Sequence, residues 1–238
     1  MECLNCKFTL NKTNFFCPQC GQKTSIKRLD TSAVLNEAFQ SFTNADKGIL
    51  YLLRWLPFKP GIISRGYVNG QRIKYFNPFT FLILTIGLTT FLSANFNLLA
   101  SSTADLDNPV SIFLSEHINL IIFFTAPIIG LFTCLLFRKQ KINFAESLIL
   151  SCYCSGERSV AFALIVTPVI VFLRDYYLVI ISLYLVAFAL YYAWACCQFF
   201  NTFSKMFFFK GFMVTVFSQI SISFAVSVGF YIYYAFVK

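Results

Sequence analysis

The chain has 238 residues, of which 58% are hydrophobic and only 12% are charged. Because soluble domains carry about 25% charged residues, this composition excludes an ordinary water-soluble protein and favours the bilayer as solvent. The net charge of +9 is concentrated before residue 79, where 11 of the 19 lysines and arginines lie, as is typical of a cytoplasmic membrane face.

Two cysteine pairs open the chain, Cys3-x2-Cys6 and Cys17-x2-Cys20. Two such knuckles at this separation can place four thiolates in a tetrahedron around Zn²⁺. A site closed by four thiolates has no open position for a substrate, so we expect its zinc to be structural. Gly21 follows the second pair and permits the tight turn that a knuckle needs.

These cysteines define a zinc ribbon over residues 1–28, which is too small to fold without a metal. We expect Phe8, Phe15 and Phe16 to form its small core. Iron in a rubredoxin-like site would use the same ligands, and four reduced thiols without metal are the other alternative. A cytoplasmic location also predicts that these cysteines form no disulfides.

Residues 29–77 predict a basic amphipathic juxtamembrane region. A helical pattern begins at Asp30, an apolar run covers 49–56, and Pro60-Gly61 opens a short helix that ends at Gly70. Basic head groups on aromatic-rich helices suit the lipid headgroup region, and a solvated connector is the alternative. The predicted membrane-interface residues are Arg54, Lys59, Arg65, Arg72 and Lys74.

Residues 78–238 predict an all-α bundle of about five transmembrane helices. Asn77-Pro78 is a typical helix start, with Asn as the cap. A span needs about 20 apolar residues, and four uncharged runs meet that length. A fifth run is interrupted by charges, and it is either one long helix or a broken one. The predicted spans are 79–99, 118–137, 144–173, 176–200 and 211–237.

Basic residues alternate between the connecting segments. Segment 100–117 has no lysine or arginine, whereas 138–143 has three. The next connection carries Arg174 with an adjacent acid, and the last carries Lys205 and Lys210. The positive-inside rule therefore places the N-terminus in the cytoplasm and the C-terminus outside a multi-pass protein of the cytoplasmic (inner) membrane.

A polar site inside the bundle is predicted at Glu157, Arg158 and Gln219. A charge at the centre of a span costs about 2.5–3.5 kcal/mol, so it calls for a partner or a function. Adjacent helical residues point about 100° apart, which makes Glu157 and Arg158 a poor mutual pair. A break at Ser155-Gly156, an offset helix or a water-filled dip are the alternatives.

Gln219 belongs to a stripe of polar and small residues at every fourth position of the last helix. Such stripes usually pack one helix on another in lipid, and lining a conduit is the alternative. The stripe consists of Thr215, Gln219, Ser223 and Ser227.

No recognisable catalytic motif occurs, and His117 is the one histidine of the chain, so we do not predict an enzyme. Nucleic-acid binding is disfavoured because the N-terminal charges are few and lack a reading element. The expected partners are the lipid bilayer and a protein docked at the ribbon, and a homo-oligomer is compatible with the sequence.

Several motifs resemble one known family. The ribbon ends in Cys-Gly-Gln, and the juxtamembrane region contains Asp46-Lys47-Gly48, Pro60-Gly61, Tyr67, Gly70-x-Arg72 and Tyr75-Phe76-Asn77-Pro78-Phe79. In these motifs, over residues 1–85, the chain is similar to an uncharacterised bacterial family of multi-helix membrane proteins with an N-terminal zinc ribbon. That family is filed among the domains of unknown function, so the resemblance implies fold and location but no activity.

One family feature is missing. The resemblance implies a Glu-His pair at the start of the third helix, whereas here Glu146 is followed by Ser147. From the sequence we therefore expect a membrane scaffold or adaptor whose structural zinc ribbon docks a protein. The alternative is a small transporter or lipid-handling protein that uses the polar site in the bundle.

Overall fold

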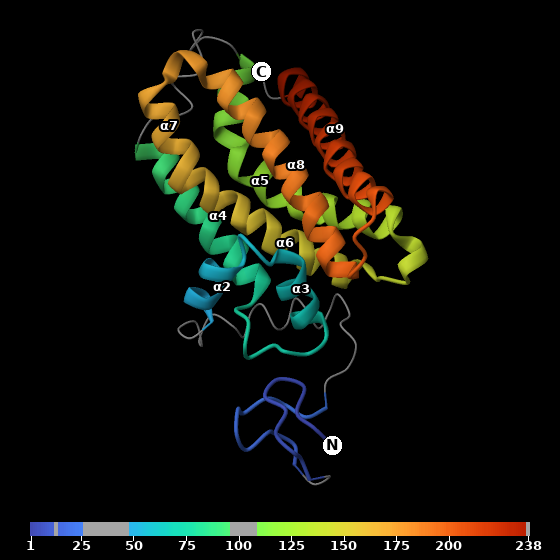
Figure 1. Cartoon of the computed structure of the whole chain (residues 1–238). Coiled ribbons are helices and arrows are strands. Elements are labelled where there is room, and N and C mark those ends of the chain that lie inside the picture. The colour runs from blue at the N-terminus through green and yellow to red at the C-terminus, as the bar shows by residue number, and fades with distance from the viewer. Residues whose placement is uncertain (12–13, 26–47, 96–108, 237–238) are drawn as a thin grey trace.

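The computed structural model describes residues 1–11, 14–25, 48–95 and 109–236, and Figure 1 traces them from the N-terminal ribbon to the C-terminal helix. Within them the regular structure is helical, apart from two isolated β-bridges in the ribbon. The predicted helix beginning at Asp30 lies outside the described residues, as do residues 100–108 of the acidic connection.

Two short helices precede a set of long apolar ones. The short helices are α2 (Ile49–Trp55) and α3 (Pro60–Val68). The longer elements are α4 (Pro78–Asn95), α5 (Pro109–Leu136), α6 (Phe144–Ala161) with a π-helical turn (Phe162–Val166) and α7 (Thr167–Phe172), α8 (Tyr177–Phe200) and α9 (Lys205–Phe236).

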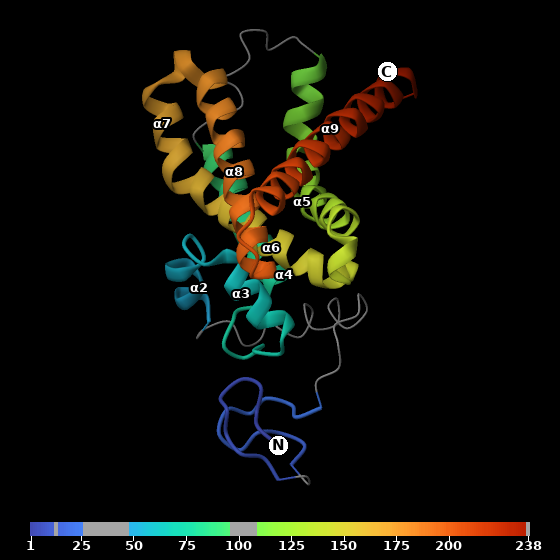
Figure 2. The ribbon, with the colours of Figure 1, turned by 45° about the vertical axis from the view of Figure 1, so that its right-hand side comes forward.

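The long helices run up and down between two ends of the molecule. The ribbon, α2 and α3 lie at one end, and α4, α6 and α9 start there (Figure 1). The C-terminus lies at the opposite end in both views, and α9 diverges from α8 toward that end (Figure 2). The connection between α5 and α6 and the connection between α8 and α9 lie at the same end as the ribbon (Figure 1).

Three segments are long and apolar enough to cross a membrane, namely Phe144–Phe172, Arg174–Phe200 and Lys205–Ala235. They coincide with the third, fourth and fifth predicted spans. The first two predicted spans also form apolar helices, but their described apolar parts, Pro78–Leu92 and Ile121–Leu136, are shorter. Two boundaries differ, since α5 begins at Pro109 and α9 at Lys205, where Ser204 Oγ accepts the Phe207 N–H at 3.3 Å.

The structure explains one of the charges in the third predicted span, namely Glu146 near its start. Glu146 completes a capping box, because its backbone N–H donates to Asn143 Oδ1 (2.7 Å) while its carboxylate accepts the Asn143 N–H (3.2 Å). The helix continues through Ser155 and Gly156, so the proposed break there is wrong. The departure from α-geometry lies one turn later, at Phe162–Val166.

The start of α3 is fixed to α8 by hydrogen bonds between one side chain of α8 and backbone groups at the start of α3. Gln198 Oε1 accepts the Gly61 N–H and Gln198 Nε2 donates to the Phe58 carbonyl, each at 3.1 Å. A Cβ on Gly61 would collide with the backbone of Ala195 and Phe199, so only glycine permits this approach. Because α3 meets α8 in this way, it packs on the end of the bundle.

The rest of the segment is held by tyrosines and an apolar core. Tyr191 Oη donates to the Leu56 carbonyl (2.9 Å), and Tyr153 Oη donates to the Phe76 carbonyl (2.6 Å). The Asn77 side chain accepts the N–H groups of Phe79 and Thr80, which confirms its predicted capping role. The core beneath contains Leu52, Leu56, Ile63, Tyr67, Ile149 and Tyr153.

The predicted interface cations surround this docked segment. Arg54, Lys59, Arg65 and Lys74 are exposed, whereas Arg72 is half-buried. Lys59 Nζ lies 4.7 Å from the Trp55 ring centroid, and Lys74 Nζ lies 5.3 Å from that of Tyr75. Cationic heads on aromatic faces fit the predicted contact with lipid headgroups, which stays a prediction.

Candidate functional site

The two cysteine knuckles adopt the same backbone conformation. In the first, the Lys7 N–H donates to the Cys3 carbonyl (2.9 Å). In the second, Gly21 N–H donates to the Cys17 carbonyl (2.8 Å). Lys7 and Gly21 occupy equivalent positions, and both have a positive φ, 64° and 75°. The predicted turn at Gly21 is therefore confirmed, and its counterpart at Lys7 adopts the same conformation without a glycine.

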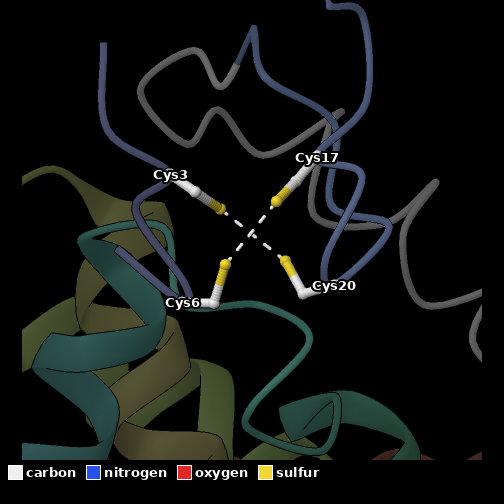
Figure 3. Close-up of side chains that lie close together, drawn as sticks. All are labelled: Cys3, Cys6, Cys17 and Cys20. Atoms are coloured by element: carbon white, nitrogen blue, oxygen red, sulfur yellow. Dashed lines mark hydrogen bonds between the residues drawn. The ribbon is translucent and has the colours of Figure 1, made fainter. Parts of the chain in front are cut away.

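Pairing the knuckles brings the four sulfur atoms together. All four Sγ atoms lie within 4.8 Å of one another, and the Cys3–Cys20 and Cys6–Cys17 pairs are 3.6 and 3.5 Å apart (Figure 3). Four thiolates around an ion with bonds of about 2.3 Å would have sulfur–sulfur distances of about 3.8 Å. The cluster therefore fits a tetrahedral metal ion, and its cysteines form no disulfide.

The electrostatics of the cluster also suit a cation. Burial raises the pKa of Cys3, but the backbone at Cys6 and Asn5 and the thiols of Cys20 and Cys6 lower it to about 7. At Cys6 the backbone at Phe8 lowers the pKa, whereas desolvation and the other thiols raise it to about 12. A metal would replace the protons that the crowded thiols retain, so acidification would oppose its binding.

The prediction that three phenylalanines form the core of the ribbon is wrong. Phe15 is 82% and Phe16 60% exposed, and Phe8 is also exposed. The buried cluster consists instead of Cys3, Leu10 and Cys17. A domain this small has room for only the cysteines and one aliphatic side chain around the sulfur cluster, so the aromatic rings point outward.

The ribbon is hydrogen-bonded to the segment that follows α3. Gln22 is 5% exposed, and its Nε2 donates to the Gly70 carbonyl (2.8 Å) while its Oε1 accepts the Arg72 N–H (3.3 Å). Asn5 Oδ1 accepts the Lys74 N–H at 3.1 Å. The first knuckle thus supplies Asn5 and the second is followed by Gln22, so that two carboxamides link the ribbon to residues 70–74.

Asn5 and Gln22 were not among the predicted site residues. A sequence signal existed, because both are uncharged carboxamides placed within or directly after a cysteine pair. Their hydrogen-bond partners are backbone groups, however, and because every residue has a backbone, the sequence does not indicate which residue is the partner.

The predicted polar site in the bundle is assembled in part. Arg158 and Gln219 line one cavity of about 180 Å³ between α5, α6, α8 and α9, together with Thr215 and Ser218. Glu157 does not line it, and its Oε2 is buried without a hydrogen-bond partner among the described residues. No ion pair joins Glu157 to Arg158 in the described structure, in agreement with the expected poor geometry.

The polar stripe of α9 has two environments. Thr215 is buried against the bundle, whereas Gln219, Ser223 and Ser227 are exposed in the described structure. Within the described chain only the first residue of the stripe packs against another helix, because α9 diverges from α8 (Figure 2). The side chain of His117 lies outside the described residues.

Fold and site together define a largely helical protein with apolar helices of membrane-spanning length and an N-terminal four-cysteine cluster that could hold a metal. Residues 46–90 match the family described as "Protein of unknown function (DUF3667)". This confirms the resemblance to a family of unknown function, and the match begins after the ribbon. No curated protein and no solved structure matches the chain.

Replacing Gln22 tests the link between the ribbon and residues 70–74. Gln22→Leu removes both hydrogen bonds while leaving the four thiolates in place. We expect amide hydrogen exchange at Arg72 to accelerate roughly five- to tenfold, because a net hydrogen bond contributes about 1 kcal/mol. Metal content should not change. Gln19→Leu, at an exposed ribbon position, is the matched control; equal exchange at Arg72 in both variants would contradict the link.

Proposed function

We propose that this protein is an integral membrane scaffold whose N-terminal ribbon holds a structural Zn²⁺ and docks a protein partner. The observation that supports this proposal most is that the ribbon contains a closed four-sulfur cluster and exposes aromatic side chains. The same ribbon is hydrogen-bonded to the segment that follows α3. A closed cluster offers no position for a substrate, and aromatic side chains are enriched at protein interfaces. Anchoring and docking therefore suit this division of the chain better than catalysis.

Zinc is the proposed metal because it takes four thiolates in a tetrahedral structural site. Iron would accept the same ligands, so the metal content of the purified protein distinguishes them. One zinc per chain and no visible absorption from iron–thiolate charge transfer is the expected result.

All five long helices are proposed to cross the inner membrane, with the ribbon in the cytoplasm. The basic connections lie at the ribbon's end of the bundle, as the positive-inside rule requires of a cytoplasmic face. A reporter that is active only outside the cytoplasm should be active after Lys238 and inactive at Met1. Activity at both ends, or at neither, would contradict this orientation.

Partner docking is tested by co-purification from native membranes. Cys17→Ser with Cys20→Ser should abolish metal binding and reduce partner recovery to background, because the ribbon cannot fold without its cluster. Phe15→Ser with Phe16→Ser should lose the partner as well but keep the zinc, because these exposed rings are not needed for folding.

Phe58→Ser is the control, since Phe58 is 65% exposed but belongs to the segment between α2 and α3. It should retain both zinc and partner. Recovery of every partner by the Phe15/Phe16 variant would refute docking through the ribbon's aromatic surface.

A second candidate is a small transporter or lipid-handling protein. The cavity beside Arg158 supports it, because it brings a cation on α6 together with polar groups from α5 and α9 near the middle of apolar segments. Intramembrane ionisable residues commonly mark pathways for ions or polar ligands.

A further inference from the structure

The cavity beside Arg158 lies at the mid-depth of the helices. Arg158 is midway along Phe144–Phe172, and Phe188 and Gln219 are near the middle of the two other apolar segments. If these helices span a bilayer, the cavity is about 15 Å from either edge of a hydrocarbon core that is about 30 Å thick.

The side chains of the cavity supply hydrogen-bond donors for an anion. The Arg158 guanidinium lies 4.8 Å from the Phe188 ring centroid, and Tyr184 Oη donates to the Arg158 backbone carbonyl (2.8 Å). The guanidinium and the Gln219 amide have no hydrogen-bond partner among the described residues. A guanidinium presents five N–H groups in a planar fork that matches a carboxylate or phosphate.

The hydroxyls of the cavity have a different role. Thr125, Thr215 and Ser218 each donate their hydroxyl hydrogen to a carbonyl of their own helix, at 2.8, 2.7 and 2.6 Å. Their oxygens therefore face a ligand as acceptors. A ligand that carries both an oxyanion and hydroxyl groups would accept hydrogen bonds from the donors of the cavity and donate hydrogen bonds to its acceptor oxygens.

The volume of the cavity and the exposure of residues at its wall favour binding of a lipid headgroup rather than of a whole drug-sized ligand. The volume of about 180 Å³ corresponds to about six water molecules, below the ~300 Å³ of common ligand pockets. Val186, at its wall, is 53% exposed, and Gln219 is exposed as well, so the cavity opens sideways between α8 and α9. Alkyl chains attached to a headgroup could remain in the surrounding bilayer.

We propose that this cavity binds the oxyanion headgroup of a membrane amphiphile, with Arg158 as the main anion-binding residue and Gln219 as a second donor. A membrane source is favoured because a soluble anion would have to cross hydrocarbon, whereas a lipid approaches laterally through the opening. This inference rests on the second proposed function and names its ligand.

The test uses full-length protein in detergent, titrated with phosphatidylglycerol and observed by native mass spectrometry. Phosphatidylcholine with the same acyl chains is the competitor without net charge. We expect phosphatidylglycerol to bind at least tenfold more tightly, and Arg158→Gln to weaken it at least tenfold, in line with the strength of charge-assisted hydrogen bonds. Lys23→Gln, which removes an exposed cation of the ribbon that is not among the predicted membrane-interface residues, should leave the affinity unchanged.

Gln219→Leu provides a second variant at an exposed position, so that the test does not depend on Arg158→Gln folding. It should weaken phosphatidylglycerol binding several-fold. Equal binding of the two lipids, or equal losses in the Lys23 and Arg158 variants, would overturn the proposed site. Displacement of the lipid by millimolar glycerol 3-phosphate would overturn the membrane source.

Binding and movement of lipid are separate outcomes. If vesicles containing the protein do not exchange phosphatidylglycerol between leaflets while Arg158-dependent binding persists, the site stands and lipid transport is refuted. If binding itself is absent, the inference fails whatever the transport result.

Discussion

The bridge from Gln198 to the start of α3 is the interaction on which the rest of this structure depends. One buried carboxamide accepts the Gly61 N–H and donates to the Phe58 carbonyl, so the first turn of α3 is bonded directly to α8. At the other end of α3, Gln22 makes the same two kinds of hydrogen bond to Gly70 and Arg72. The segment thus joins the ribbon to the helical bundle through two glutamines.

This arrangement explains why a ribbon with little apolar core can hold a defined position. Its fold depends on the sulfur cluster, and its place depends on hydrogen bonds to backbone groups near a docked helix. Disruption of the sulfur cluster would remove the geometry of Gln22 and Asn5 together. The cluster is therefore linked to residues 70–74, directly before the helix that begins at Pro78, although none of its four cysteines belongs to the bundle.

Much of this was predictable from sequence, because local rules determine it. Cysteine spacing predicted the sulfur cluster, Asn77-Pro78 predicted the start of α4, and apolar runs located the long helices. The errors involve tertiary contacts that no local pattern reports. The sequence predicts Phe15 and Phe16 in the core of the ribbon, whereas the structure exposes both. The cavity is lined by Arg158 and Gln219 but not by Glu157, because the rotation of each helix about its axis decides which side chains meet.

Thermal unfolding of Gly61→Ala tests the central contact most directly. Overpacking against Ala195 and Phe199 costs about 1–3 kcal/mol, so we predict that the midpoint for the full-length protein falls by about 2–12 °C. Gly87→Ala is the matched control, because a Cβ there meets no atom within 4 Å. Its midpoint should be unchanged or slightly raised, since alanine favours helix interiors. Equal midpoints for the two variants would contradict the docking of α3 on α8.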